Sequence, residues 1–170
     1  LAVSAGQDAT VRVWNAASGS LLRTIELDGG PATALAVQGR RAVTGHGDGS
    51  LALWDLDKAE KLAVMKRSEA PITSLAFTAE PGRFTATSGE GAVTLWDARG
   101  PTGPLHVFDG HEGASNAVAF AVKGPWIASA SADRTVRLWS VSSLASVRTY
   151  KGHKDGVTAL AFSPDGKILS

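Results

Sequence analysis

Apolar and polar residues alternate strictly in four short stretches of the chain, each of which ends in tryptophan. In every copy the residues one and three places before the Trp are Val or Leu, and the residue between them varies freely. An apolar residue at every second position puts these side chains on one face of a β-strand, a pattern that a helix would not keep. The alternation therefore predicts four equivalent strands: TVRVW, SLALW, AVTLW and TVRLW.

The four tryptophans recur at a nearly constant interval. Trp14, Trp54, Trp96 and Trp139 are 40–43 residues apart, and a period of this size is typical of repeat proteins. Six places before each Trp lies an acidic residue flanked by turn-forming residues, as in GHGDGS and SGEGA, which predicts a tight hairpin there. These acidic residues are Asp8, Asp48, Glu90 and Asp133.

Each period holds the signals of four antiparallel strands. Strands such as TALAF and AVTG precede the hairpin, and strands such as LLRTI follow the Trp after a polar turn. A four-stranded sheet of this size cannot bury both faces alone, and radial stacking of such sheets is a β-propeller. An immunoglobulin-like sandwich would not repeat at this interval, and a β-solenoid has a shorter period. We therefore predict an all-β propeller of four-stranded antiparallel blades.

The predicted repeats cover 1–27, 28–67, 68–109 and 110–151, with the start of a fifth at 152–170. The chain begins and ends inside equivalent strands, LAVS and KILS, so two arrangements are open. The ends could meet and close a four-bladed ring, or the chain could be a window of a larger propeller, for example one of seven blades. We expect the window, because both ends fall in mid-strand. Its exposed blade edges would then favour self-association.

Composition and charge restrict the classes of function. The chain has 170 residues, 17 Lys and Arg against 16 Asp and Glu, and no Cys. The lack of Cys excludes disulfides, a thiolate nucleophile and Cys-based metal sites, and it fits an intracellular location in the cytoplasm or nucleus. No stretch reaches the roughly 18 apolar residues needed for membrane insertion.

The net charge of +1 gives no electrostatic sign of nucleic-acid binding. The basic residues are scattered and form no run, which indicates solvated strand faces; among them are Arg12, Arg40, Arg41, Arg134, Arg137, Arg148 and Lys151.

At several fixed positions the chain resembles the Trp-Asp (WD40) repeat family. It carries Trp-Asp at Trp54–Asp55 and Trp96–Asp97, Gly-His at Gly110–His111 and Gly152–His153, and the phrase AFSPDGK at 161–167. The resemblance covers essentially the whole chain and supports the propeller. It also implies a hydrogen-bonded network in each blade, which links a His, a Ser or Thr, the turn Asp and the Trp.

The implied network is complete in one repeat only, at His111, Ser129, Asp133 and Trp139. The first repeat has Ser4, Asp8 and Trp14. The second has Thr44, Asp48 and Trp54, with Asp28 where the His is expected. The third keeps Trp96 but has Ser68, Ala86 and Glu90 at the other positions, and His153 belongs to the start of the fifth. These departures predict less rigid second and third blades.

No catalytic, cofactor or metal site emerges from the sequence. His111 and His153 occupy the Gly-His position, and His46, in a turn, and His106, in a fourth strand, lack the partners typical of zinc ligands. The string at 45–49 opens no helix and is expected to be a hairpin rather than a phosphate loop. The resemblance therefore implies a non-enzymatic scaffold that binds other proteins or peptides and assembles a complex.

Two groups of residues are candidates for protein binding. Loops between blades and the acidic hairpins should gather at one end of the propeller, where the exposed candidates are Gln7, Glu112, Arg134, Lys154 and Asp155. The second candidate is Arg99, because 96–99 reads Trp-Asp-x-Arg. This motif resembles the adaptor contact of substrate receptors in cullin-RING ubiquitin ligases, which is the alternative function. Otherwise Arg99 simply belongs to the long turn at 98–104.

Overall fold

A computed structural model describes residues 1–100 and 103–170 and confirms the predicted all-β architecture of four-stranded antiparallel sheets. The first sheet has three strands, β1 (Ala2–Ala5), β2 (Thr10–Trp14) and β3 (Leu21–Glu26). The second sheet contains β4 (Ala32–Gln38), β5 (Arg41–His46), β6 (Ser50–Asp55) and β7 (Glu60–Lys66).

The remaining sheets follow the same strand order. The third contains β8 (Ile72–Phe77), β9 (Arg83–Ser88), β10 (Val93–Asp97) and β11 (His106–Phe108), and the fourth contains β12 (Ser115–Phe120), β13 (Trp126–Ser131), β14 (Thr135–Ser140) and β15 (Ala145–Lys151). A two-stranded sheet of β16 (Ala161–Phe162) and β17 (Ile168–Leu169) ends the chain.

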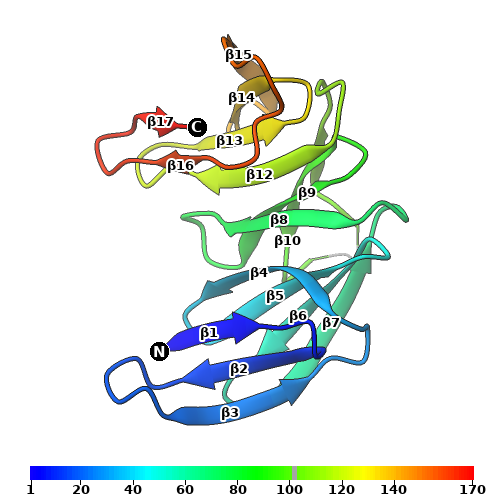
Figure 1. Ribbon diagram of the computed structural model, residues 1–170, viewed down its shortest axis with the longest axis vertical. Coiled ribbons are helices and arrows are strands. Elements are labelled where there is room, and N and C mark those ends of the chain that lie inside the picture. Colours follow the sequence, from blue (N-terminus) through cyan, green and yellow to red (C-terminus); the bar gives the residue numbers. More distant parts are fainter. Residues whose placement is uncertain (101–102) are drawn as a thin grey trace.

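The sheets stack along the long axis of the molecule as an open arc (Figure 1). β4 contacts β8, β8 contacts β12, and β12 contacts β16, so the first strands of successive blades lie side by side. The N-terminal sheet and β16–β17 lie at opposite ends of this arc. The ends therefore do not meet, and the closed four-bladed ring considered from the sequence is not formed.

The alternating residues of the Trp strands form the core between neighbouring sheets. Leu51 and Leu53 of β6 pack with Phe84 and Trp96 of the next sheet, and Val93 and Leu95 of β10 pack in the same way with Ile127 and Trp139. Neighbouring sheets thus bury the faces that they turn toward each other, as the period-two pattern predicted.

The acidic hairpins, which join β1 to β2, β5 to β6, β9 to β10 and β13 to β14, have a common backbone geometry. The residue after the acidic one has a positive φ in all four sheets: Ala9 (54°), Gly49 (79°), Gly91 (89°) and Arg134 (69°). At Gly91 a Cβ atom would lie 2.8 Å from the carbonyl oxygen of Gly113. The hairpin therefore packs directly against the loop that enters the next blade.

The described residues include no helix with the length and apolar character needed to cross a bilayer.

Candidate functional site

The fourth blade contains a continuous chain of hydrogen bonds that begins at its buried Trp. Trp139 Nε1 donates to Ser129 Oγ at 2.8 Å. Ser129 Oγ lies 2.8 Å from His111 Nε2, and His111 Nδ1 lies 2.8 Å from Asp133 Oδ2. A carboxylate only accepts, so His111 donates from Nδ1 and accepts the Ser129 hydroxyl proton at Nε2. All four predicted residues are thereby joined.

The surroundings of His111 and Asp133 in this series of hydrogen bonds determine their protonation states. Burial lowers the pKa of His111 and outweighs the opposing hydrogen bond to Asp133. Burial alone would raise the pKa of Asp133, but hydrogen bonds from Thr135, His111 and the backbone amides of Glu112 and Thr135 hold it well below its ordinary range. His111 is therefore neutral and Asp133 ionised at neutral pH.

The first sheet has only the first of these hydrogen bonds, the one from the Trp indole. Trp14 Nε1 donates to Ser4 Oγ at 2.9 Å, whereas Asp8 points to solvent and pairs with Arg12 at 2.6 Å. The side chains of Asp8 and Arg12 are 46% and 38% exposed, so this ion pair contributes little to stability.

In the second blade His46 takes the role expected of a His at position 28. The sequence predicts a turn at His46, but the residue lies in a strand. His46 is the last residue of β5 and only 2% exposed. Trp54 Nε1 donates to Thr44 Oγ1 at 2.9 Å, and Thr44 Oγ1 lies 3.0 Å from His46 Nε2. Residues two apart on a strand share a face, so His46 lies beside Thr44. Asp28, where the His was expected, is exposed and pairs with Lys61, and Asp48 bonds to Ser50.

In the third blade the acceptor for the indole lies on the strand of the Trp itself, β10, and not on the neighbouring β9. Trp96 Nε1 donates to Thr94 Oγ1 at 2.8 Å, and Thr94 is the register partner of Ala86. Glu90 forms a surface ion pair with Arg67. Thr94 occupies the position two residues before the Trp, which varies freely among the repeats. Its place opposite Ala86 in the cross-strand register is the signal that could have identified it.

The start of the fifth blade repeats the pattern of the fourth. His153 Nε2 lies 2.8 Å from Ser170 Oγ, as His111 Nε2 does from Ser129 Oγ. His106 has another environment, because its ring packs edge-on against Phe108 at a centroid distance of 4.6 Å. No group of three or more His, Asp or Glu side chains among the described residues is placed to hold a metal ion.

Four of the five loop residues proposed for protein binding lie close together. The β13–β14 hairpin, which carries Arg134, contacts the loops on both sides of it. The amide of Glu112 donates to Asp133 Oδ2 at 3.1 Å, and the amide of Val157, just beyond Lys154 and Asp155, donates to the carbonyl of Ser131 at 2.9 Å. Gln7 lies in the hairpin of the first sheet, away from this group.

Arg99 lies at the opposite end of the strands from the acidic hairpins. It follows β10 and packs on Gly82 of the β8–β9 turn. Its guanidinium donates from Nε to Asp97 Oδ1 at 3.0 Å and from Nη2 to Asp97 Oδ2 at 3.1 Å. The fork of Arg99 is therefore already engaged by the Asp of its own motif, beside a shallow hollow of about 630 Å³ that Arg40 and Arg41 also line. Residues 101–102 of the predicted turn at 98–104 lie outside the described residues.

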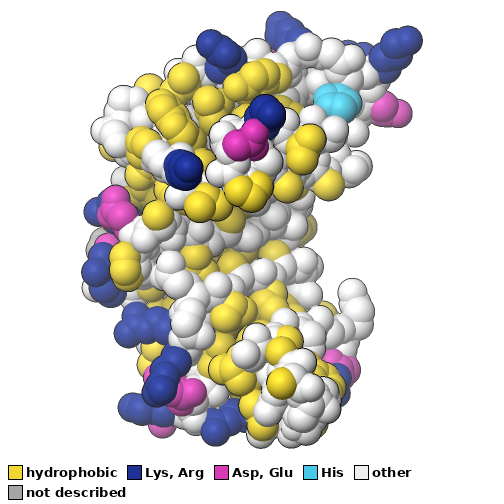
Figure 2. All heavy atoms as spheres, turned by 90° about the vertical axis from the view of Figure 1, so that its left-hand side faces the viewer, with side chains coloured by type: hydrophobic (Ala, Val, Ile, Leu, Met, Phe, Trp, Pro, Cys, Tyr) yellow, Lys and Arg dark blue, Asp and Glu magenta, His cyan; other side chains and the backbone are white. Residues whose placement is uncertain are grey.

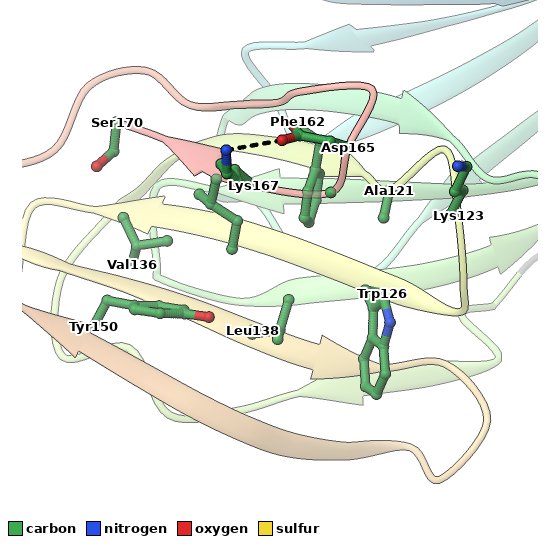
Figure 3. Close-up of a pocket in the computed structure, with 12 residues that line it drawn as sticks. Ala121, Lys123, Trp126, Val136, Leu138, Tyr150, Phe162, Asp165, Lys167 and Ser170 are labelled. Carbon is green, nitrogen blue, oxygen red and sulfur yellow. Dashed lines mark ion pairs between the residues drawn. The ribbon is translucent and has the colours of Figure 1, made fainter.

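A larger, mainly apolar hollow of about 640 Å³ separates the fourth sheet from β16–β17. Trp126 and Tyr150 lie at its two ends, and the Asp165–Lys167 ion pair lies across it on the β16–β17 hairpin (Figure 3). Figure 2 shows hydrophobic side chains gathered over this end of the molecule, and Lys and Arg side chains along one flank of the other end.

Comparison with known proteins agrees with this geometry. The family model of the WD domain, G-beta repeat, matches 102–140 and 144–170. The chain is 31% identical over 137 residues to a guanine nucleotide-binding protein subunit beta of Arabidopsis thaliana, with 75% of this chain and 36% of that protein covered. It is 34% identical over 128 residues to the ribosome biogenesis protein YTM1 of Yarrowia lipolytica, with 74% and 25% covered.

A third relative is the transcription initiation factor TFIID subunit 5 of Caenorhabditis elegans, 28% identical over 130 residues, with 76% of this chain and 20% of that protein covered. The chain thus spans about a third or less of the length of these relatives. The repeat of Trp strands, the four-stranded blades and these matches together show that the chain belongs to the WD-repeat family.

Proposed function

We propose that the protein is a non-enzymatic scaffold that binds other proteins and assembles a complex inside the cell. The observation that carries the proposal is the gathering of Glu112, Arg134, Lys154 and Asp155 at one end of the fourth blade. These exposed side chains come from three separate loops, and hydrogen bonds hold the loops of Glu112 and Lys154 to the β13–β14 hairpin between them. Polar loops held on a rigid sheet provide a preformed surface for a protein partner.

The names of the relatives support the same function. Two of them are subunits, of a guanine nucleotide-binding protein and of TFIID, and a third acts in ribosome biogenesis. An intracellular location is part of the proposal for this reason. The ubiquitin-ligase alternative depends on the four-residue motif at Arg99 alone and is not proposed.

Partner capture with charge-reversed variants tests the scaffold function. The tagged protein is compared with a triple variant, Glu112→Lys, Lys154→Glu and Asp155→Lys, which changes the loop surface. A matched control, Lys58→Glu with Glu60→Lys, changes the turn at the opposite end of the second sheet. Stoichiometric partners bound by the parent and the control but lost from the triple variant support the proposal. Recovery of chaperones alone, or equal capture by all three proteins, contradicts it.

A further inference from the structure

Arg137 is a guanidinium without a carboxylate partner, in a position where another blade provides one. It lies two residues before Trp139, as Arg12 lies two residues before Trp14. Arg12 pairs with Asp8 at 2.6 Å. The equivalent carboxylate, Asp133, is instead turned to His111. Among the described residues Arg137 therefore makes no ion pair, and its buried Nε has no hydrogen-bond partner.

The guanidinium of Arg137 is nevertheless held in place. Its Cζ lies 5.9 Å from the ring centroid of Trp139, within the range of a cation–π contact. A Cβ atom on Gly110 would lie 2.8 Å from Arg137 Nη1, so the guanidinium packs against a position that only glycine leaves open. A fixed guanidinium loses little conformational entropy when it binds a ligand.

Arg137 lines a polar hollow of about 310 Å³ together with Arg134, Lys151 and His153. Neither Arg134 nor Lys151 forms an ion pair within the described part of the chain. Two carboxylates also line the hollow. Asp133 is 9% exposed, and both of its oxygens are occupied by His111 and Thr135, whereas Glu112 has no ion pair within the same part of the chain. The fold thus brings together basic residues that are scattered in the sequence.

The hairpin conformation at Arg134 places its side chain at the edge of this hollow. Its φ of 69° lies in the left-handed region, at a hairpin position where two of the other blades have Gly. A non-glycine residue in this region has a backbone cost, which Arg134 shares with Ala9 of the first sheet. The hairpin turn aims a long cationic side chain at the rim of the hollow.

We propose that this hollow binds a phosphoryl group on a phosphoserine or phosphothreonine side chain of a protein partner. A phosphoryl group has nearly two negative charges and three acceptor oxygens, which match two guanidinium groups and one ammonium group better than a single carboxylate would. The inference rests on the proposed scaffold function, because the open hollow suits a side chain presented by another protein. It specifies which chemical group of the partner protein the scaffold recognises.

Two titrations test the site without any knowledge of the partner. Chemical shifts of the Arg137 Nε–H group are followed while sodium phosphate, a short Gly-Ser peptide with one phosphoserine, and the same peptide without phosphate are added in turn. Fluorescence polarisation of the labelled phosphopeptide then gives Kd for the parent protein and for Arg137→Gln, Arg134→Gln and Arg23→Gln. Arg134 lies exposed in a hairpin, so its substitution does not threaten the core, and Arg23 is an exposed control on β3.

The expected result is a saturable shift with the phosphopeptide, a weaker one with phosphate and none with the unphosphorylated peptide. Arg137→Gln should raise Kd about tenfold and Arg134→Gln several-fold, whereas Arg23→Gln should leave it unchanged. No shift with either phosphorylated probe, or an equal effect of Arg23→Gln, overturns the site. Binding of free phosphate alone overturns the protein-borne ligand, and equal binding of both peptides overturns the phosphoryl group.

The partner-capture experiment separates this inference from the scaffold function. Partners that bind Arg137→Gln as well as the parent protein would contradict the phosphoryl site and leave the scaffold proposal standing. If the phosphopeptide binds but no partner is captured, the scaffold proposal is contradicted and the phosphoryl site stands.

Discussion

The hydroxyl of Thr94 accepts a 2.8 Å hydrogen bond from Trp96 Nε1 in a blade whose second strand has Ala at the position that provides the acceptor elsewhere. The second strand has Ala86 there, and Ala86 and Thr94 face each other across β9 and β10. The Thr94 hydroxyl in turn donates to the Ala86 carbonyl oxygen at 3.0 Å. The buried indole thus keeps its partner although the residue that usually supplies it has changed.

Thr94→Val should destabilise the protein by about 1–3 kcal/mol, because it keeps the shape of the side chain and leaves a buried indole N–H unpaired. Urea denaturation measures the change. Thr94→Ser retains the hydroxyl and should be close to the parent in stability. Adding Ala86→Ser to Thr94→Val should recover part of the loss, since it returns the acceptor to the position used by Ser129 in the fourth blade. A Val variant as stable as the parent would contradict this account.

The strands and blades were predictable because their signals are local and repeated. The alternation around each Trp and the near-constant spacing of the four Trp residues indicate the strand faces and the succession of sheets, and the acidic turn marks each hairpin. Each of these signals recurs in every blade, so a single departure does not hide it.

The hydrogen-bond partners were less predictable, because they depend on which side chains meet across strands. His46 reaches Thr44 because the two lie on the same face of β5, and Thr94 reaches the indole because it faces Ala86. Family positions pointed instead to Asp28 and Ala86. The second blade therefore has a His partner, and the third blade an indole acceptor, that a motif alignment does not show.

Asp133→Ala should cost about 1–3 kcal/mol of unfolding free energy, because it removes the acceptor of His111 and of the Glu112 amide inside the blade. Glu90→Ala is the matched control, at the same register position in the third blade. Glu90 makes a surface ion pair with Arg67, whose loss should cost at most about 1 kcal/mol. Chemical denaturation of both variants makes the comparison, and equal losses would argue against a stabilising network at Asp133.

Gly91→Ala should destabilise the protein by more than the backbone conformation alone explains. Its φ of 89° disfavours any L-residue, and the new Cβ would lie 2.8 Å from the carbonyl oxygen of Gly113. Gly39→Ala is the control, since Gly39 has a φ of 62° and a Cβ added to it would have no atom within 4 Å. We expect a loss of about 1 kcal/mol for Gly39→Ala and clearly more for Gly91→Ala by thermal or urea unfolding. Similar losses at both positions would show that the hairpin can move away from the neighbouring loop.

Acidification should weaken the fourth blade in two steps. Because burial lowers the pKa of His111, folding favours its neutral form, and this stabilisation is present above the unfolded pKa of about 6.5. It is lost as the pH falls through the lower folded pKa. The pKa of Asp133 is also lowered, so its contribution is present above about pH 4 and is lost only in stronger acid. The first step should therefore appear just below neutral pH.

Urea denaturation of the parent protein and of His111→Gln, at about pH 7 and about pH 5, isolates the first step. Glutamine does not titrate, so the variant should be less stable than the parent at neutral pH but should lose less stability between the two conditions. The three other histidines are common to both proteins, and their contribution cancels in the difference. An equal loss in both proteins would mean that His111 is as easily protonated in the folded blade as in the unfolded chain. A greater stability of the parent at pH 5 than at pH 7 would mean that the ion pair with Asp133 outweighs the burial of the imidazole.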